Sequence, residues 1–118
     1  MDALVVDDSA FMRNMMKGIL EDMSFENIYE AENGQEAVEM HEEKQPDLVT
    51  LDVVMDEMSG IDALEEIKGK DDEVNVIMVS AVGQDQMVEE AKELGAETFV
   101  DKPFDEDDVK DTVTDLII

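Results

Sequence analysis

The sequence predicts a single α/β domain over residues 1–118, with a doubly wound, parallel five-stranded sheet covered by helices. Short apolar runs rich in β-branched residues recur along the chain, and amphipathic segments of helical period lie between them. Such an alternation of strands and helices is typical of a parallel sheet with helices on its faces. The length of 118 residues and the apolar fraction of 43% suit one compact core.

Five segments are predicted to be strands. Residues 4–6, 48–51 and 76–79 are short runs rich in β-branched residues and without alternation, which is typical of strands buried on both faces. Residues 27–30 alternate between polar and apolar side chains, which favours an edge strand, and residues 98–100 form the fifth strand.

Five helices are predicted between and after these strands. The first spans residues 9–23 with a wide apolar stripe that includes Phe11 and Met15, and we expect its methionines to fill the core. The second begins near Asn33, the third follows Gly60, and the fourth ends at Gly95, a normal stop signal. The last carries the apolar positions Val109, Val113, Leu116 and Ile117.

The charge is strongly negative, with 34 acidic residues against eight basic ones and a formal net charge of −26. Nucleic acid and anionic membranes would be repelled, so we expect neither as a partner. The chain has no cysteine and no apolar run of spanning length, so we expect a soluble, cytoplasmic monomer. Because concentrated salt screens such a surface, we interpret the acidity as the signature of an extreme halophile.

Polar residues follow four of the predicted strands. Asp7 and Asp8 follow the first, Asp52 the third, Ser80 the fourth and Lys102 the fifth. In open α/β sheets, ligands bind outside the carboxyl ends of the strands, so these side chains should converge there. Asp7 and Asp8 alone would be read as a helix cap and Lys102 alone as a surface lysine, but together they predict a site.

Three converging carboxylates repel one another, and a hard divalent cation relieves this repulsion. Oxygen ligands with room for water suit Mg²⁺. Asp52 is the central carboxylate and the natural nucleophile for an acyl phosphate, while Lys102 and Ser80 can neutralise or hydrogen-bond phosphoryl oxygens. The residues therefore predict a magnesium-dependent phosphoryl acceptor.

Four motifs carry a resemblance to a known family: Val5-Val6-Asp7-Asp8-Ser9, Leu51-Asp52, Ser80-Ala81 and Lys102-Pro103-Phe104. Together they resemble the receiver domains of two-component response regulators, over essentially the whole chain. The segment from Asp8 to Leu20 is most similar to the stand-alone chemotaxis regulators of this family. The resemblance implies a flavodoxin-like fold with strand order 2-1-3-4-5.

The resemblance also implies roles for matched positions. Asp52 would accept a phosphoryl group from a histidine kinase of the chemotaxis type. Asp8, Asp52 and the backbone carbonyl of Val54 would ligate Mg²⁺, with Asp7 acting through water. Lys102 would pair with the phosphoryl group, and its bond to Pro103 is expected to be cis.

A switch is implied as well. Ser80 would move toward the phosphoryl group and Phe99 would turn inward, which would reshape the face made by the fourth helix, fifth strand and fifth helix. That face would bind an adaptor of the motility apparatus, since no DNA-binding segment follows residue 118.

Some positions depart from the family pattern. Asp56 replaces a usual proline, which would leave the loop looser and more negative near the metal. Phe99 lacks the hydroxyl of the tyrosine often found there. Val54 and Val82 are apolar at two positions that tune self-hydrolysis, so we predict a long-lived phosphoryl state.

The sequence also bears on other functions. An aspartyl-phosphate hydrolase of the haloacid dehalogenase kind needs an acid where Val54 stands, so we expect catalysis only of self-phosphorylation and self-dephosphorylation. A flavin module needs an uncharged phosphate loop, and a degenerate receiver would serve only for docking. A stand-alone phosphorelay receiver outside chemotaxis remains the alternative function. His41 is interpreted as a solvated helix residue, and Arg13 as part of a surface ion pair.

Overall fold

The computed structural model describes residues 1–55 and 58–117, so the expectation for Asp56 lies outside the described residues. The strands are β1 (Asp2–Val6), β2 (Asn27–Ala31), β3 (Leu48–Asp52), β4 (Asn75–Ser80) and β5 (Thr98–Asp101). The helices are α1 (Ala10–Asp22), α2 (Gly34–Lys44), α3 (Gly60–Lys70), α4 (Asp85–Glu93) and α5 (Glu106–Ile117).

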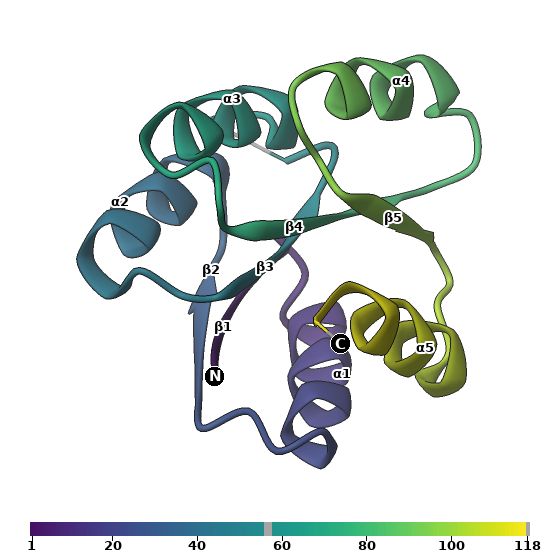
Figure 1. Ribbon diagram of the computed structural model, residues 1–118. Helices are drawn as coiled ribbons and strands as arrows, with labels where there is room; N and C mark the ends of the chain where they lie inside the picture. Colours follow the sequence, from purple (N-terminus) through teal and green to yellow (C-terminus); the bar gives the residue numbers. More distant parts are fainter. Residues whose placement is uncertain (56–57, 118) are drawn as a thin grey trace.

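The five strands form one sheet in the order β2-β1-β3-β4-β5, and every neighbouring pair is parallel. This confirms the predicted α/β class and the flavodoxin-like strand order. The segment predicted to be an edge strand is β2, which lies at one edge of the sheet with mostly half-exposed residues. Reversal of the winding direction after β2 places β1 and β3 side by side near the middle of the sheet (Figure 1).

Helices cover both faces of the sheet. α2, α3 and α4 lie on one face, and α1 and α5 lie on the other (Figure 1). Each layer has its own apolar core: Leu64 and Ile67 of α3 pack on the first face, and Ile19 and Leu20 of α1 pack on the second. Burial of these side chains supplies most of the free energy that favours folding.

Polar side chains cap the starts of α1 and α2. The side chain of Ser9 accepts a hydrogen bond from the Met12 N–H, and Asn33 caps α2 in the same way. Gly95, which follows the end of α4, has a φ of 106°, a conformation that glycine adopts without strain. Among the described residues, no helix combines the length and apolarity needed to cross a membrane.

The structure corrects the predicted apolar stripe of the first helix. Phe11 is 63% exposed and Met15 is 38% exposed, whereas Met16, Ile19 and Leu20 are buried. The buried face of α1 is therefore narrower than predicted and leaves its flank in solvent. A helix that packs on a sheet from one side buries only one face, so apolar residues beyond that face stay exposed.

The interpretation of His41 as a solvated residue was wrong. His41 is 2% exposed, and its Nε2 lies 3.3 Å from Oδ2 of Asp71 at the end of α3. It completes the buried series Gly34, Ala37, Val38 and His41, which has the spacing of one helix face. The glutamates next to His41 in the sequence point to solvent, but His41 itself lies on the side of α2 that faces α3.

Candidate functional site

The sheet topology brings the predicted site residues to one edge. Asp7 follows β1, Asp52 ends β3, Ser80 ends β4, and Lys102 follows β5. Because all five strands are parallel, their carboxyl ends lie at the same edge of the sheet. β1 and β3 are adjacent, so the loop after β1 stands directly beside Asp52.

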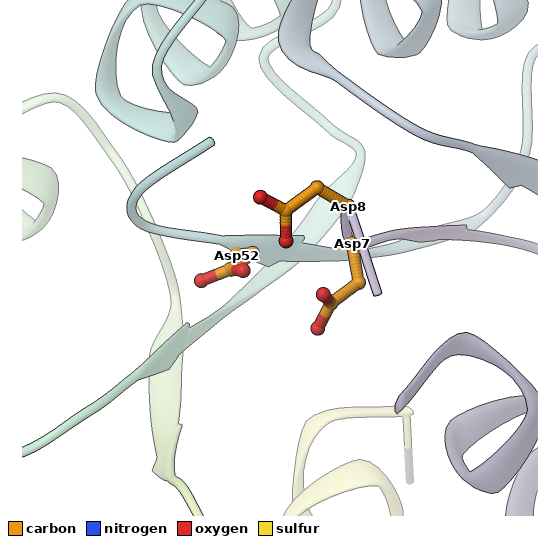
Figure 2. Close-up of side chains that lie close together, drawn as sticks. All are labelled: Asp7, Asp8 and Asp52. Carbon is orange, nitrogen blue, oxygen red and sulfur yellow. The ribbon is translucent and has the colours of Figure 1, made fainter. Parts of the chain in front are cut away.

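Three carboxylates form the centre of this edge. Asp7, Asp8 and Asp52 each place one oxygen within 4.8 Å of the others, and Figure 2 shows the three side chains converging from two strand ends. Asp7 and Asp52 are each 5% exposed, while Asp8 is exposed. Two buried acids and one accessible acid give an oxygen-only donor set that could hold a hard cation such as Mg²⁺.

Lys102 places its ammonium between two of these acids. Its Nζ lies 3.0 Å from Oδ2 of Asp7 and 3.0 Å from Oδ2 of Asp52. Burial on its own lowers the pKa of Lys102, but the hydrogen bonds to Asp52 and Asp7 and the negative charges of both acids together outweigh it, and the net pKa is raised. The side chain is therefore a charged ammonium shared by two carboxylates. The peptide bond from Lys102 to Pro103 is cis, as expected.

One ammonium does not neutralise this cluster. Burial raises the pKa of the Asp52 carboxyl, the hydrogen bond from Lys102 lowers it, and the charge of Asp7 raises it again. The net pKa of Asp52 lies above its ordinary value. The negative form of Asp52 is thus held at some cost, and a further cation at this edge would relieve that cost.

A glycine allows the backbone after Asp52 to pass close to α3. A Cβ built on Gly60 would lie 1.9 Å from the backbone oxygen of Asp52, and the Gly60 N–H donates to the Val53 carbonyl at 3.0 Å. Only a residue without a side chain fits there. The start of α3 therefore packs directly against the strand end that carries the central carboxylate.

Ser80 has a partner that sequence reasoning missed. Its hydroxyl is buried and donates to Oδ1 of Asp101 at 3.4 Å, and the two residues are register partners on β4 and β5. The signal was present, because Asp101 is an acid immediately before Lys102 at the end of the predicted fifth strand. Its contact with Ser80 depends on strand register, which single-strand patterns do not give.

The remaining predicted residues lie around the cluster. Val54 is 47% exposed and Val82 is 98% exposed, so both apolar side chains face solvent in the loops after β3 and β4. Phe99 lies on β5, half-buried against the α3 and α4 layer, and Nζ of Lys92 lies 4.7 Å from its ring centroid. Phe99 is thus separate from the carboxylate cluster and adjoins α4.

Comparisons with known proteins agree with this arrangement. The family model of the response regulator receiver domain matches residues 3–114. The chain is 52% identical to the chemotaxis protein CheY of Bacillus subtilis over 110 residues, which are 93% of this chain and 92% of that protein. It is 46% identical to CheY of Halobacterium salinarum over 97% of this chain and 94% of that protein.

Comparison with solved structures also shows similarity to a CheY protein. The chain is similar to a structure titled as the CheX-CheY-BeF3-Mg complex of Borrelia burgdorferi, with a TM-score of 0.93 and 36% identity. The match covers 99% of this chain and 89% of that one. From its sequence, its fold and its acidic edge, the chain belongs to the response regulator receiver domain family and is a homologue of the chemotaxis protein CheY.

Proposed function

We propose that this protein is a single-domain response regulator that accepts a phosphoryl group at Asp52 from a histidine kinase and thereby controls chemotaxis or motility. The observation that carries the proposal is the cluster of Asp7, Asp8 and Asp52, whose oxygens lie within 4.8 Å of one another beside the shared ammonium of Lys102. About 50% identity to CheY proteins supports the chemotaxis assignment.

The donor set supports Mg²⁺ as the cofactor. Asp8, Asp52 and the backbone carbonyl of Val54 would ligate the ion. Asp7 would act through water, which fits the fact that one of its oxygens accepts the Ser9 N–H at 2.9 Å and the other pairs with Lys102. Bound there, the ion would offset the charge of the acids and of an incoming phosphoryl group.

Phosphoryl transfer would use groups already at the edge. An oxygen of Asp52 would attack the phosphorus of a phosphohistidine, and the N–P bond would break with its electron pair going to the imidazole. Nζ of Lys102, now 3.0 Å from Asp52, would pair with an oxygen of the new acyl phosphate. Self-dephosphorylation would be hydrolysis of that acyl phosphate, and turnover of other substrates is not proposed.

The switch would start from the bonds that these residues make at rest. The Ser80 hydroxyl would leave Asp101 for a phosphoryl oxygen, and the Phe99 ring, beside Lys92, would turn inward. Movement of Ser80 and Phe99 would reshape the α4-β5-α5 face for an adaptor of the motility apparatus. The Borrelia burgdorferi structure titled as a complex of CheX with CheY supports a protein partner of this kind.

The acidic surface supports three further parts of the proposal. A net charge of −26 would repel nucleic acid and anionic membranes and would oppose self-association, so the protein would act as a cytoplasmic monomer. At molar salt, where the Debye length is ~3 Å, this repulsion would be screened, which supports a halophilic origin. Circular dichroism at decreasing salt concentration tests the halophilic origin, which predicts that the protein loses its structure at low ionic strength.

A phosphotransfer assay tests the function. A purified chemotaxis-type histidine kinase, autophosphorylated with labelled ATP, should pass its label to the wild-type protein in the presence of Mg²⁺. Asp52→Asn should receive none. Faster transfer from a phosphorelay kinase than from the chemotaxis kinase would favour the phosphorelay alternative, and absence of transfer from either would reject the proposal.

A further inference from the structure

Arg13 is the only arginine of the chain and stands in the first turns of α1. Its side chain is only 11% exposed, so it is more than the surface ion pair that the sequence indicates. Burial of a charged group to this extent is costly unless the group gains several polar partners. The identity of these partners indicates what Arg13 does.

The guanidinium joins three segments. Nη1 donates to the backbone carbonyl of Asp7 at 2.7 Å, and Nε donates to Oε1 of Glu30 on β2 at 3.3 Å. Nη2 lies 3.6 Å from Oε1 of Glu32, just after β2. The planar fork of arginine can serve all three at once, which a lysine ammonium on a flexible stem does less well.

The bond to the Asp7 carbonyl bears on the metal site through the peptide plane. The peptide that links Asp7 to Asp8 is planar, so the carbonyl of Asp7 and the Cα of Asp8 are oriented together. The preceding peptide is also held, because the Asp7 N–H donates to the Ala31 carbonyl at 3.2 Å. Asp8, the exposed member of the carboxylate cluster, has its starting direction set by this plane.

We propose that Arg13 is a positioning residue for the metal site: its guanidinium holds the Asp7–Asp8 peptide so that both carboxylates face the same cation as Asp52. This inference rests on the proposed function, because it assumes that a divalent cation binds at the cluster. Arg13 contacts the backbone that carries the ligands and acts through them.

If Arg13 acted only through its charge, its removal would change Mg²⁺ affinity in the opposite direction. A guanidinium close to a cation site repels the cation, so if Arg13 were only a nearby charge, its removal would strengthen Mg²⁺ binding. If Arg13 positions the peptide, its removal weakens binding. Loss of a group that orients metal ligands lowers metal affinity by about 10- to 100-fold in known sites.

Lys17 offers a matched control. It lies one turn further along α1, and its Nζ pairs with Oε2 of the same Glu30 at 3.5 Å, with side-chain exposure of 37%. Lys17→Gln removes a positive charge from the same helix and the same acid. It leaves the bond from Arg13 to the Asp7 carbonyl in place.

The experiment is a calorimetric titration of the full chain with MgCl₂ in 1 M KCl, where surface charges are largely screened. We expect roughly tenfold weaker binding for Arg13→Gln, and also for Arg13→Lys, which keeps the charge but loses the fork. Lys17→Gln should bind as tightly as wild type or slightly more tightly. Thermal unfolding checks that each variant is folded at the titration temperature. If Arg13→Gln is unfolded, the test rests on the Mg²⁺ affinity of Arg13→Lys.

The outcomes separate this inference from the proposed function. Unchanged or tighter Mg²⁺ binding by the folded Arg13 variants, with normal binding by wild type, overturns the inference and leaves the function standing. Equal weakening by Lys17→Gln also overturns it. A wild-type protein that binds no Mg²⁺ overturns both.

Discussion

Replacement of Asp52 by asparagine is expected to stabilise the protein when no divalent cation is present. The substitution keeps the shape of the side chain and removes a buried negative charge whose pKa is raised, chiefly by burial. Lys102 keeps its pairing with Asp7, at 3.0 Å. The variant therefore loses the repulsion at the cluster without leaving the ammonium unpaired.

The magnitude follows from the distances at the cluster. At an effective dielectric constant of about 20, the attraction of Asp52 to Lys102 across 3.0 Å is about 5.5 kcal/mol. Each repulsion by an acid within 4.8 Å is at least about 3.5 kcal/mol. Because Asp8 is exposed and its repulsion is screened, these attractions and repulsions largely cancel. The penalty for burying the Asp52 charge, which is the largest cause of its raised pKa, then decides the sign, and we expect a gain of about 1 kcal/mol. For a domain of this size, that raises Tm by about 4 °C.

The pH dependence has a definite sign. Because the pKa of Asp52 is raised in the folded state, ionised Asp52 destabilises the fold above that pKa. The penalty fades as the pH falls through the raised value, and it is absent below the ordinary pKa, where both states are protonated. The difference in Tm between Asp52→Asn and wild type should therefore be largest near neutral pH and shrink in acid.

The assay is thermal unfolding by circular dichroism in 1 M KCl, with EDTA or with MgCl₂. At a Mg²⁺ concentration 100 times the dissociation constant, the wild type gains about 2.7 kcal/mol, so the order of stability should reverse. Glu65→Gln, which removes an exposed carboxylate of α3, controls for the general effect of charge. A wild type more stable than Asp52→Asn in EDTA, or no reversal with Mg²⁺, would refute the reasoning.

Three further substitutions, one of them with a control variant, test neighbouring parts of the site. Gly60→Ala should destabilise the protein by about 2 kcal/mol or more in urea unfolding, because its Cβ meets the Asp52 backbone oxygen at 1.9 Å. Gly69→Ala on the same helix, with no atom within 4 Å, should instead be neutral or stabilising. Lys102→Gln should slow phosphorylation by acetyl phosphate roughly 100-fold, because a cation facing the phosphoryl oxygens is lost. Val54→Asn should shorten the lifetime of the phosphoryl adduct about tenfold, since an amide at this exposed position can orient an attacking water.

Each of these has an outcome that contradicts it. Equal effects of Gly60→Ala and Gly69→Ala would mean that the close approach of α3 to Asp52 is unimportant. An unchanged phosphorylation rate in Lys102→Gln would remove the lysine from the reaction. A lifetime in wild type no longer than in Val54→Asn would contradict the predicted long-lived phosphoryl state.

Patterns along the chain were enough to predict the fold and the location of the site. The runs at residues 48–51 and 76–79 show no alternation because β3 and β4 are buried on both faces, which is typical of central strands in a parallel sheet. Residues that follow parallel strands must meet at one edge, so Asp7, Asp52 and Lys102 could be placed together without coordinates.

Features that depend on packing between elements could not be predicted in this way. His41 is buried because α2 packs on α3, and its acidic neighbours concealed this. Phe11 is exposed because the sheet covers only one face of α1. The contacts of Arg13 with Asp7 and Glu30 depend on how the first turns of α1 lie against two strand ends.

The most direct test of the central claim is the intact mass of the protein after incubation with acetyl phosphate and Mg²⁺. The account predicts one phosphoryl adduct on the wild type, little or none in EDTA, and none on Asp52→Asn. A wild type that gains no adduct, or an adduct of equal yield on Asp52→Asn, would contradict it.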